Sequence, residues 1–385
     1  MRKAALWFLV TALLGAPFPD HGSFAQRQPG PKARLHATTD WHIQPSFVMD
    51  TVCFLNVMTG DPFYTRYYKD DYEKFEPRLT PDARNALANL KRKIKDEKKN
   101  IVSALLALYF SATNDRTLDD MLATVENSRN MKSNLQKTTY YSDSGWQLYE
   151  SVREDLRTVL LFLKAINFDS YWTQNILPRV ESKIADIKKD LPKYNVINEV
   201  EKLLGARLPS NELTVYILNY SQPHGIRVTG LRFLTDVAYP FRIVLRNAVH
   251  EPMHPPYNLA HDVELKAALD RLRTDTFLID KVTRHDPAFG YNSFEGFIEE
   301  DSVQALEQII NEKFGVEVEA RKRWKENDDG MHVFAVALYS LMREEDFGSG
   351  SEPFRDFLIR MIRSGKLAAG RIEPIYNSFY SQGIK

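Results

Sequence analysis

Apolar residues recur at helical spacing from about residue 47 to residue 203, which predicts a mainly helical first half. Within it, Thr80 followed by Pro81 is typical of a helix start. The threonine hydroxyl caps the first turn, and proline needs no hydrogen-bond donor there. The spacing predicts one helix from this start through Phe110. Further amphipathic helices are expected over 146–166 and 180–191.

The pattern changes near Gly205, where strand-like runs replace the helical spacing. Residues 213–221 are rich in β-branched and aromatic side chains, and a segment with Pro223 and Gly225 follows them. Residues 226–236 form a second strand-like run. Helical spacing then returns over 264–282, 294–315, 331–345 and 354–365.

These patterns together predict an α+β fold that is mainly α-helical. A boundary near residue 205 separates a helical N-terminal region, 26–205, from a second region, 206–385. In the second region a small β-sheet is expected to be followed by helices.

The first 25 residues have the layout of a secretory signal peptide. Arg2 and Lys3 precede an apolar run, 4–16, that is too short to span a bilayer comfortably. Small residues at Ser23 and Ala25 predict cleavage after Ala25. The protein is therefore expected to be secreted or periplasmic, without stable membrane insertion after cleavage. An uncleaved membrane anchor is the alternative.

Composition limits the possible partners and metal ligands. Lys and Arg together number 51, as do Asp and Glu, and this balance argues against a dedicated nucleic-acid binder. The single cysteine, Cys53, lies in an apolar stretch typical of a buried thiol and has no partner for an intrachain disulfide. Any metal site must therefore use histidine and carboxylate ligands.

His250 and His254 have the spacing of a His-Glu-x-x-His zinc motif. On a helix, residues four apart point to the same side, so both imidazoles can bind one ion. Glu251 lies next to the first histidine, where it can reach a water and act as a general base.

Pro252 lies inside this motif and opposes a continuous helix, at a cost of ~3 kcal/mol. Two arrangements remain open. The helix starts near His250, so that proline lies in the first turn. Alternatively, a helix from about Ile243 kinks at Pro252 and stops at His254.

A catalytic zinc site needs a third protein ligand. The predicted helix over 291–306 carries Glu295, Glu299 and Glu300. Glu295 lies beside two phenylalanines, where an unpaired carboxylate would be costly. Glu299 is one turn further on, suitably spaced to orient a ligand histidine.

The combination resembles the gluzincin-type zinc metallopeptidases, the MA-like clan that joins a His-Glu-x-x-His helix to a glutamate on a later helix. Residues 294–298, Phe-Glu-Gly-Phe-Ile, are similar to the Asn-Glu-Gly-Phe-Ala segment of its aminopeptidase branch. The resemblance implies that His250, His254 and Glu295 bind one Zn²⁺ ion and that Glu251 is the catalytic base. It also implies that Glu299 holds the first histidine, and that residues 206–385 form a zincin-like domain acting on a peptide or protein substrate.

Some assignments stay open. His261 is a rival third ligand, although the metzincin pattern that would use it places a glycine before the histidine, and none stands there. A side chain facing the developing oxyanion is also expected. The candidates are Tyr257, Tyr291, His332 and Tyr339.

The sequence thus predicts an exported zinc-dependent metallohydrolase, in the first place a peptidase that uses a zinc-activated water with Glu251 as general base. Two alternatives remain. The chain is a catalytically silent binding or scaffold protein that retains the fold, or a metallohydrolase that acts on another bond.

Overall fold

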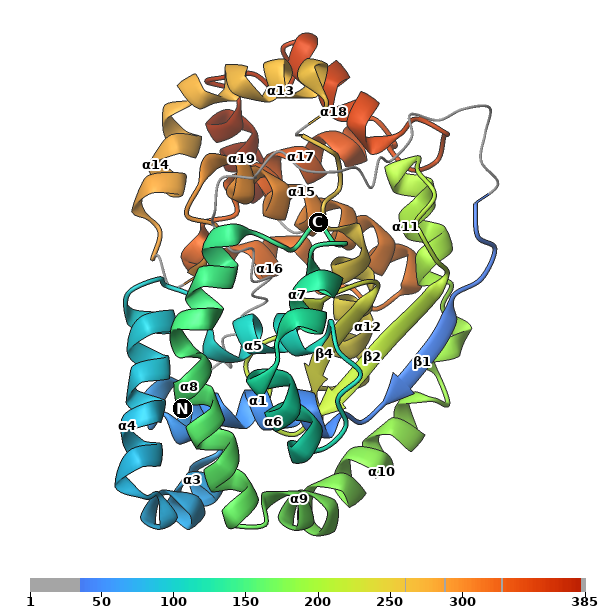
Figure 1. The fold of residues 1–385 in the computed structure, drawn as a ribbon. Helices are drawn as coiled ribbons and strands as arrows, with labels where there is room; N and C mark the ends of the chain where they lie inside the picture. Colours follow the sequence, from blue (N-terminus) through green and yellow to red (C-terminus); the bar gives the residue numbers. More distant parts are fainter. Residues whose placement is uncertain (1–34, 260, 287–288, 327, 382–385) are drawn as a thin grey trace.

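The computed structural model describes residues 35–259, 261–286, 289–326 and 328–381 (Figure 1). Of the residues that the structure describes, 64% lie in helices and 6% in strands, which confirms the predicted α+β, mainly helical class. The predicted signal peptide and its cleavage site after Ala25 lie outside the described residues. Within these ranges, no helix is both long and apolar enough to cross a membrane.

The N-terminal region is helical, as predicted. Its helices are α1 (Phe47–Met58), α2 (Pro62–Thr65), α3 (Lys69–Phe75), α4 (Pro81–Leu90), α5 (Val102–Phe110), α6 (Leu118–Glu126), α7 (Arg129–Leu135), α8 (Asp143–Ala165), α9 (Phe168–Tyr171), α10 (Leu177–Ile187) and α11 (Val196–Leu204).

The helix predicted from Thr80 through Phe110 has the expected start but is wrong in length. The Thr80 side chain accepts a hydrogen bond from the backbone N–H of Ala83, which caps α4. After α4 the chain forms a π-helical turn and then reverses, with Lys99 at a φ of 57°. This left-handed residue ends the helix, and α5 begins separately at Val102.

A four-stranded mixed sheet lies at the centre, in the order β1-β2-β4-β3. β1 (Asp40–Gln44) and β4 (Arg232–Asp236) run parallel to β2 (Glu212–Leu218), while β3 (Ile226–Val228) runs antiparallel to β4. The second strand-like run is therefore a hairpin, which turns at Gly230 with a φ of 75°. β1 was not predicted, and it joins the N-terminal region to the sheet.

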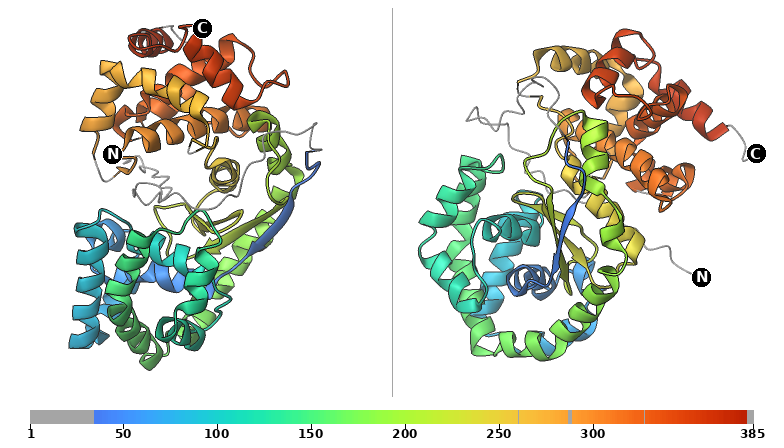
Figure 2. Two further views of the ribbon diagram at one scale, coloured as in Figure 1. Left: turned by 45° about the horizontal axis from the view of Figure 1, so that its top comes forward. Right: turned by 90° about the vertical axis from the view of Figure 1, so that its right-hand side faces the viewer.

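Helices cover both faces of the sheet (Figure 2). α1 and α5 pack on one face, and α10 and α12 pack on the other. α12 spans Phe241–His250. The helices that follow it gather above the sheet in Figure 1. They are α13 (Val263–Asp270), α14 (Thr276–Arg284), α15 (Phe294–Phe314), α16 (Ala320–Glu326), α17 (Val333–Glu344), α18 (Phe354–Arg363) and α19 (Ile372–Ser381).

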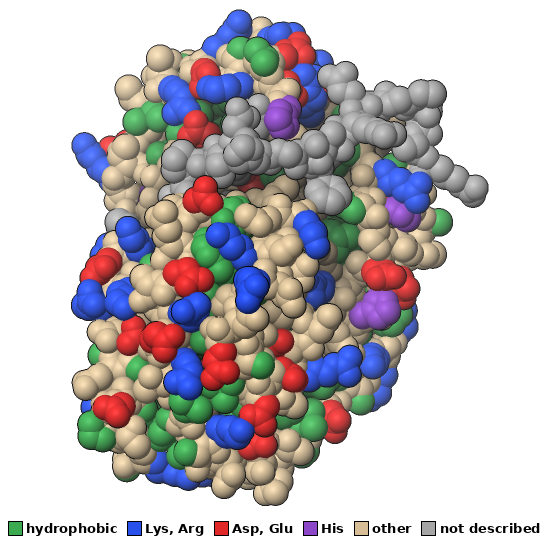
Figure 3. All heavy atoms as spheres, viewed as in Figure 1, with side chains coloured by type: hydrophobic (Ala, Val, Ile, Leu, Met, Phe, Trp, Pro, Cys, Tyr) green, Lys and Arg blue, Asp and Glu red, His purple; other side chains and the backbone are tan. Residues whose placement is uncertain are grey.

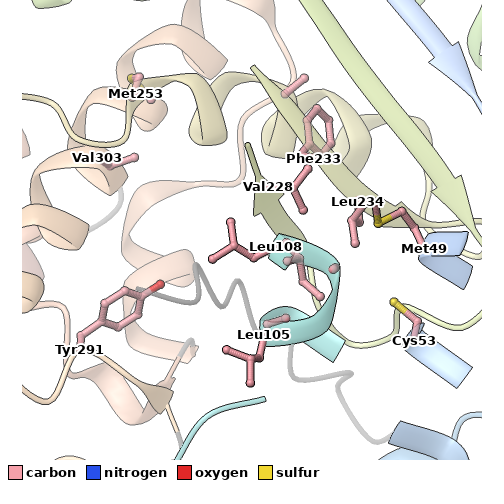
Figure 4. Packing of buried hydrophobic residues seen from close by; sticks show 14 of the residues in the cluster. Met49, Cys53, Leu105, Leu108, Val228, Phe233, Leu234, Met253, Tyr291 and Val303 are labelled. Carbon is pink, nitrogen blue, oxygen red and sulfur yellow. The ribbon is translucent and has the colours of Figure 1, made fainter. Parts of the chain in front are cut away.

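One connected hydrophobic core runs from the sheet to the C-terminal helices. Figure 4 shows part of it, from Cys53 on α1 through Leu108 on α5 and Phe233 on β4 to Val303 on α15. Cys53 is fully buried and free, as predicted. On the outer face drawn in Figure 3, Lys, Arg, Asp and Glu side chains are interspersed.

Asp50 is a buried polar link between α1, the end of β2 and the π-helical turn Trp172–Ile176. Its Oδ1 accepts the backbone N–H groups of Asn219 and Tyr220 at 2.8 and 2.9 Å. Its Oδ2 accepts the indole N–H of Trp172 at 2.8 Å. Burial raises the pKa of Asp50 to about 7, although these three donors oppose the shift. The carboxyl therefore satisfies three buried donors at once.

At pH 8, where this carboxyl is ionised, Asp50→Asn turns an amide N–H toward the Trp172 indole. We expect it to lower the free energy of unfolding by about 1–3 kcal/mol, measured by chemical denaturation. Asp119→Asn, at an exposed position on α6, is the matched control and should change it by less than about 0.5 kcal/mol. Equally small losses in both variants would contradict the role of Asp50.

Candidate metal centre

Pro252 determines how α12 ends. The α-helix stops at His250, residues 251–253 form one 3₁₀ turn, and His254 is extended with φ −84° and ψ 129°. Proline has no N–H for the carbonyl four residues earlier, so an α-helix cannot continue through it without losing that bond. Of the two arrangements left open by the sequence, the structure shows the helix that bends at Pro252 and stops at His254.

Three buried ligand atoms meet beside this bend. The Nε2 atoms of His250 and His254 lie 2.9 Å apart. Oε2 of Glu300, from α15, lies 3.6 Å from the first and 3.4 Å from the second. In a tetrahedral zinc site with bonds near 2.0–2.1 Å, neighbouring ligand atoms are about 3.4 Å apart. The triangle therefore has the size that one such ion requires.

Carboxylates on the outer side of each imidazole fix its tautomer. His250 Nδ1 lies 3.0 Å from Glu307 Oε2, and His254 Nδ1 lies 3.2 Å from Glu299 Oε1. An ionised carboxylate only accepts hydrogen bonds, so both Nδ1 atoms must donate. In the neutral imidazoles the lone pairs of both Nε2 atoms then point at each other and at Glu300. Three acceptors that converge in this way need a cation or protons between them.

The charges show how strongly this position attracts protons. Burial lowers the pKa of His250, but Glu300 and Glu307 outweigh it and raise that pKa to about 10. The pKa of His254 is also raised, because Glu299 and Glu300 outweigh its burial. The two histidines hold the pKa of Glu300 well below its usual range despite burial. Protons therefore compete with any metal ion at this site.

Glu307 anchors the site to its surroundings. Besides His250, its carboxylate accepts from Arg246 Nε at 3.0 Å, Arg323 Nη2 at 2.8 Å and Asn311 Nδ2 at 2.8 Å. All five side chains are buried. The two guanidinium groups and the His250 ring hold the pKa of Glu307 far below its usual range, although burial opposes this. The network gives His250 one fixed orientation.

Glu251 lies next to the triangle but is not part of it. It is 2% exposed, and neither carboxylate oxygen has a hydrogen-bond partner among the described residues. Burial raises its pKa, while His250 and His254 act in the opposite direction. The backbone of Gly225 packs against it, since a Cβ there would stand 3.7 Å from Glu251 Oε1 and 2.9 Å from Asn247 Nδ2. A buried carboxylate with two unused acceptors is suited to take a proton from a water or substrate.

The structure does not bring Glu295, the predicted third ligand, to the two histidines. Glu295 lies in the first turn of α15, where its side chain is 41% exposed and pairs with Arg273. Glu300 is five residues further on, about 140° around the helix, and faces the histidines instead. Segment 294–298, which carries the resemblance to the aminopeptidase branch, supplies none of the three converging atoms.

The predicted contact of Glu299 with a ligand histidine is present, but it is made to the second histidine. Glu299 holds His254, and Glu307 holds His250, the partner that the resemblance assigned to Glu299. His261, the rival third ligand, is exposed and is not in the metal-ligand group formed by His250, His254 and Glu300.

The oxyanion candidates have different surroundings. Tyr339 donates to Glu312, and His332 lies between Asp301 and Asp328 at 2.6 and 2.9 Å. Burial opposes charge on His332, but these two carboxylates raise its pKa to about 10. Tyr257 and Tyr291 are both buried. Burial raises the pKa of Tyr257 well above its usual range, and the nearby charge of Glu299 adds to this effect.

The sequence did not reveal Glu300 as the third converging group, nor the residues that hold Glu300 and His250 in place. The supporting side chains are Arg246, Gln304, Glu307, Asn311 and Arg323. A usable signal existed on α15, because Glu300, Gln304, Glu307 and Asn311 recur at intervals of four, three and four and so share one helix face. A polar stripe of this kind is ordinarily read as solvent-exposed.

Comparisons with known proteins add no relative: no protein-family model, curated protein or solved structure matches this chain. The resemblance to gluzincins stays a prediction, and the functional argument rests on the geometry of the site.

Glu307→Ala leaves Arg246 and Arg323 buried without their carboxylate. We expect the free energy of unfolding to fall by about 3–5 kcal/mol, or the protein not to fold. Glu295→Ala on the same helix is the control, because Glu295 is 41% exposed and pairs with Arg273, which is 40% exposed. It should cost about 1 kcal/mol or less. Similar thermal melts for both variants would show that the buried network contributes little.

Proposed function

We propose that the protein is a hydrolase that depends on one divalent metal ion, most suitably Zn²⁺. Nε2 of His250, Nε2 of His254 and Oε2 of Glu300 would be its protein ligands. The observation that carries the proposal is their convergence at 2.9, 3.4 and 3.6 Å with both Nδ1 atoms turned outward to carboxylates. Two imidazoles and one carboxylate are a ligand set that catalytic zinc sites use.

A bound ion would supply Lewis-acid chemistry, polarising a carbonyl and making hydroxide available near neutral pH. Glu251 would act as the general base and take the proton from the attacking water. Its oxygens have no hydrogen-bond partner among the described residues, and the neighbouring imidazoles favour its charged form. Arg227 donates to the backbone carbonyls of Glu251 and His254, which fixes the turn that carries the base.

Peptide bonds are the proposed substrate. The support is the order of strands, motif helix and glutamate helix, which is similar to that of gluzincin peptidases. We also propose that the protein is exported, because residues 1–25 have the layout of a signal peptide.

A structural metal site is the second candidate, and burial favours it. His250, Glu251, His254 and Glu300 are each at most 5% exposed, as is usual where metal stabilises a fold. In that case the protein would bind metal without hydrolysing peptides. Both candidates use the same three ligands. They differ in whether Glu251 acts as a general base.

The choice of third ligand is tested by a matched pair on one helix. Glu300→Ala should abolish stoichiometric zinc binding, because two histidines alone do not complete a site. Glu295→Ala removes a half-exposed carboxylate paired with Arg273 and should bind zinc like the wild type. Zinc content after dialysis against a weak chelator measures this. The opposite pattern would restore Glu295 as the ligand.

Glu251→Gln separates the two functional candidates. It keeps the size of the side chain and spares the ligands, so zinc binding should persist. Hydrolysis of a fluorogenic peptide library should fall by at least about 100-fold, because the base is lost. His250→Ala, which removes a ligand, should lose both. Wild type that binds zinc and never cleaves any peptide would favour the structural site.

A further inference from the structure

Gln304 lies one turn after Glu300 on α15 and is 3% exposed. Its side-chain Nε2 donates to Oε1 of Glu300 at 2.9 Å. Its Oε1 accepts from Trp324 Nε1 at 3.0 Å and from Arg323 Nη2 at 3.4 Å. The amide thus connects the proposed ligand to two fixed donors on α16.

These two donors determine which way the amide points. Indole and guanidinium groups only donate hydrogen bonds, so the atom that faces them must be the amide oxygen. The amide nitrogen must then face Glu300. His332 Nε2 also lies 3.2 Å from it, but the two ring N–H groups of His332 go to Asp301 and Asp328. One of the two hydrogens on this nitrogen is therefore donated to Glu300.

The two oxygens of Glu300 consequently have different surroundings. Oε1 is held by Gln304, while Oε2 faces the two histidine Nε2 atoms. A free carboxylate can bind a cation through one oxygen or both. One-oxygen binding leaves a fourth position of a tetrahedral ion open, as catalysis requires.

We propose that Gln304 is a positioning residue that makes Glu300 a one-oxygen ligand and so preserves the open coordination position. This inference rests on the proposed metal site. Gln304 touches neither metal nor substrate and acts only through Glu300, while Trp324 and Arg323 keep its amide from turning over.

The helix supplies a matched control. Gln308 is one turn after Gln304, is 1% exposed and also bonds Arg323, whose Nη1 donates to its Oε1 at 3.0 Å. Its own Nε2 donates to Glu312 and to the carbonyl of Val318, away from the histidines. A general loss of packing on α15 should therefore affect both glutamine positions alike.

The test compares Gln304→Met with Gln308→Met, because methionine keeps the length and volume but cannot donate. Co²⁺ and Zn²⁺ are titrated into wild type and both variants, with thermal melts of the metal-free proteins. Gln304→Met should weaken Zn²⁺ binding by about 10- to 100-fold. Its Co²⁺ absorption should also lose intensity, as it does when coordination rises above four. Gln308→Met should match wild type in both readouts.

The outcomes distinguish failure of the proposed metal site from failure of the proposed role of Gln304. Wild type that binds neither ion overturns the proposed function itself. Wild type that binds, with Gln304→Met and Gln308→Met alike in affinity and spectrum, overturns only the role of Gln304. Should Gln304→Met not fold, Trp324→Phe takes its place, since it removes one donor that orients the amide. It should shift the Co²⁺ spectrum in the same direction, and an unchanged spectrum would refute the proposal.

Discussion

The site depends on two imidazole Nε2 atoms that lie 2.9 Å apart. Each ring is held in this orientation by a carboxylate that contacts its Nδ1 atom. Lone pairs in this arrangement repel one another, and Glu300 adds a third acceptor. A buried group of this kind is stable only with positive charge at its centre. The raised pKa values of His250 and His254 show that protons can supply that charge, and a divalent ion fits the same space.

The surrounding fold holds this arrangement by burying polar residues on α15. Gln304, Glu307, Gln308 and Asn311 are all buried there and bond to one another or to Arg323. Buried ion pairs of this kind add little net stability, because desolvation offsets much of their attraction. They give the ligands one orientation instead. The contribution of α15 to the site is therefore the placement of Glu300 and His250.

Much of the fold could be predicted from the sequence, because periodicity reports local structure. The mainly helical class and the strand over 213–221 follow from it, and the cap at Thr80 follows from its residue type. β1 could not be found, since five residues that alternate weakly give no clear signal and pair with β2 far along the chain. The break before α5 was not predicted, because apolar spacing continues across Lys99. The left-handed backbone conformation of Lys99 leaves no mark in that spacing.

The site was predicted only in part. The spacing of His250 and His254 located two of the three converging groups, and Pro252 indicated the bend, because both are properties of a short segment. The third converging group could be found only by knowing which face of α15 meets α12. With glutamates at 295, 299 and 300, the choice depends on a rotation of the helix that packing sets and spacing does not. Glu307 and Gln304 were missed for the same reason, since a buried polar face cannot be told from a solvated one by pattern.

The most direct test of the account is anomalous X-ray diffraction from crystals of protein purified without added metal and then equilibrated with one equivalent of Zn²⁺. Data above and below the zinc absorption edge locate the ion independently of any assumption about ligands. The account predicts one peak about 2 Å from Nε2 of His250, Nε2 of His254 and Oε2 of Glu300. A peak elsewhere, for example at the exposed group of Asp40, His42 and Glu212, or no peak with both imidazoles protonated, would contradict it.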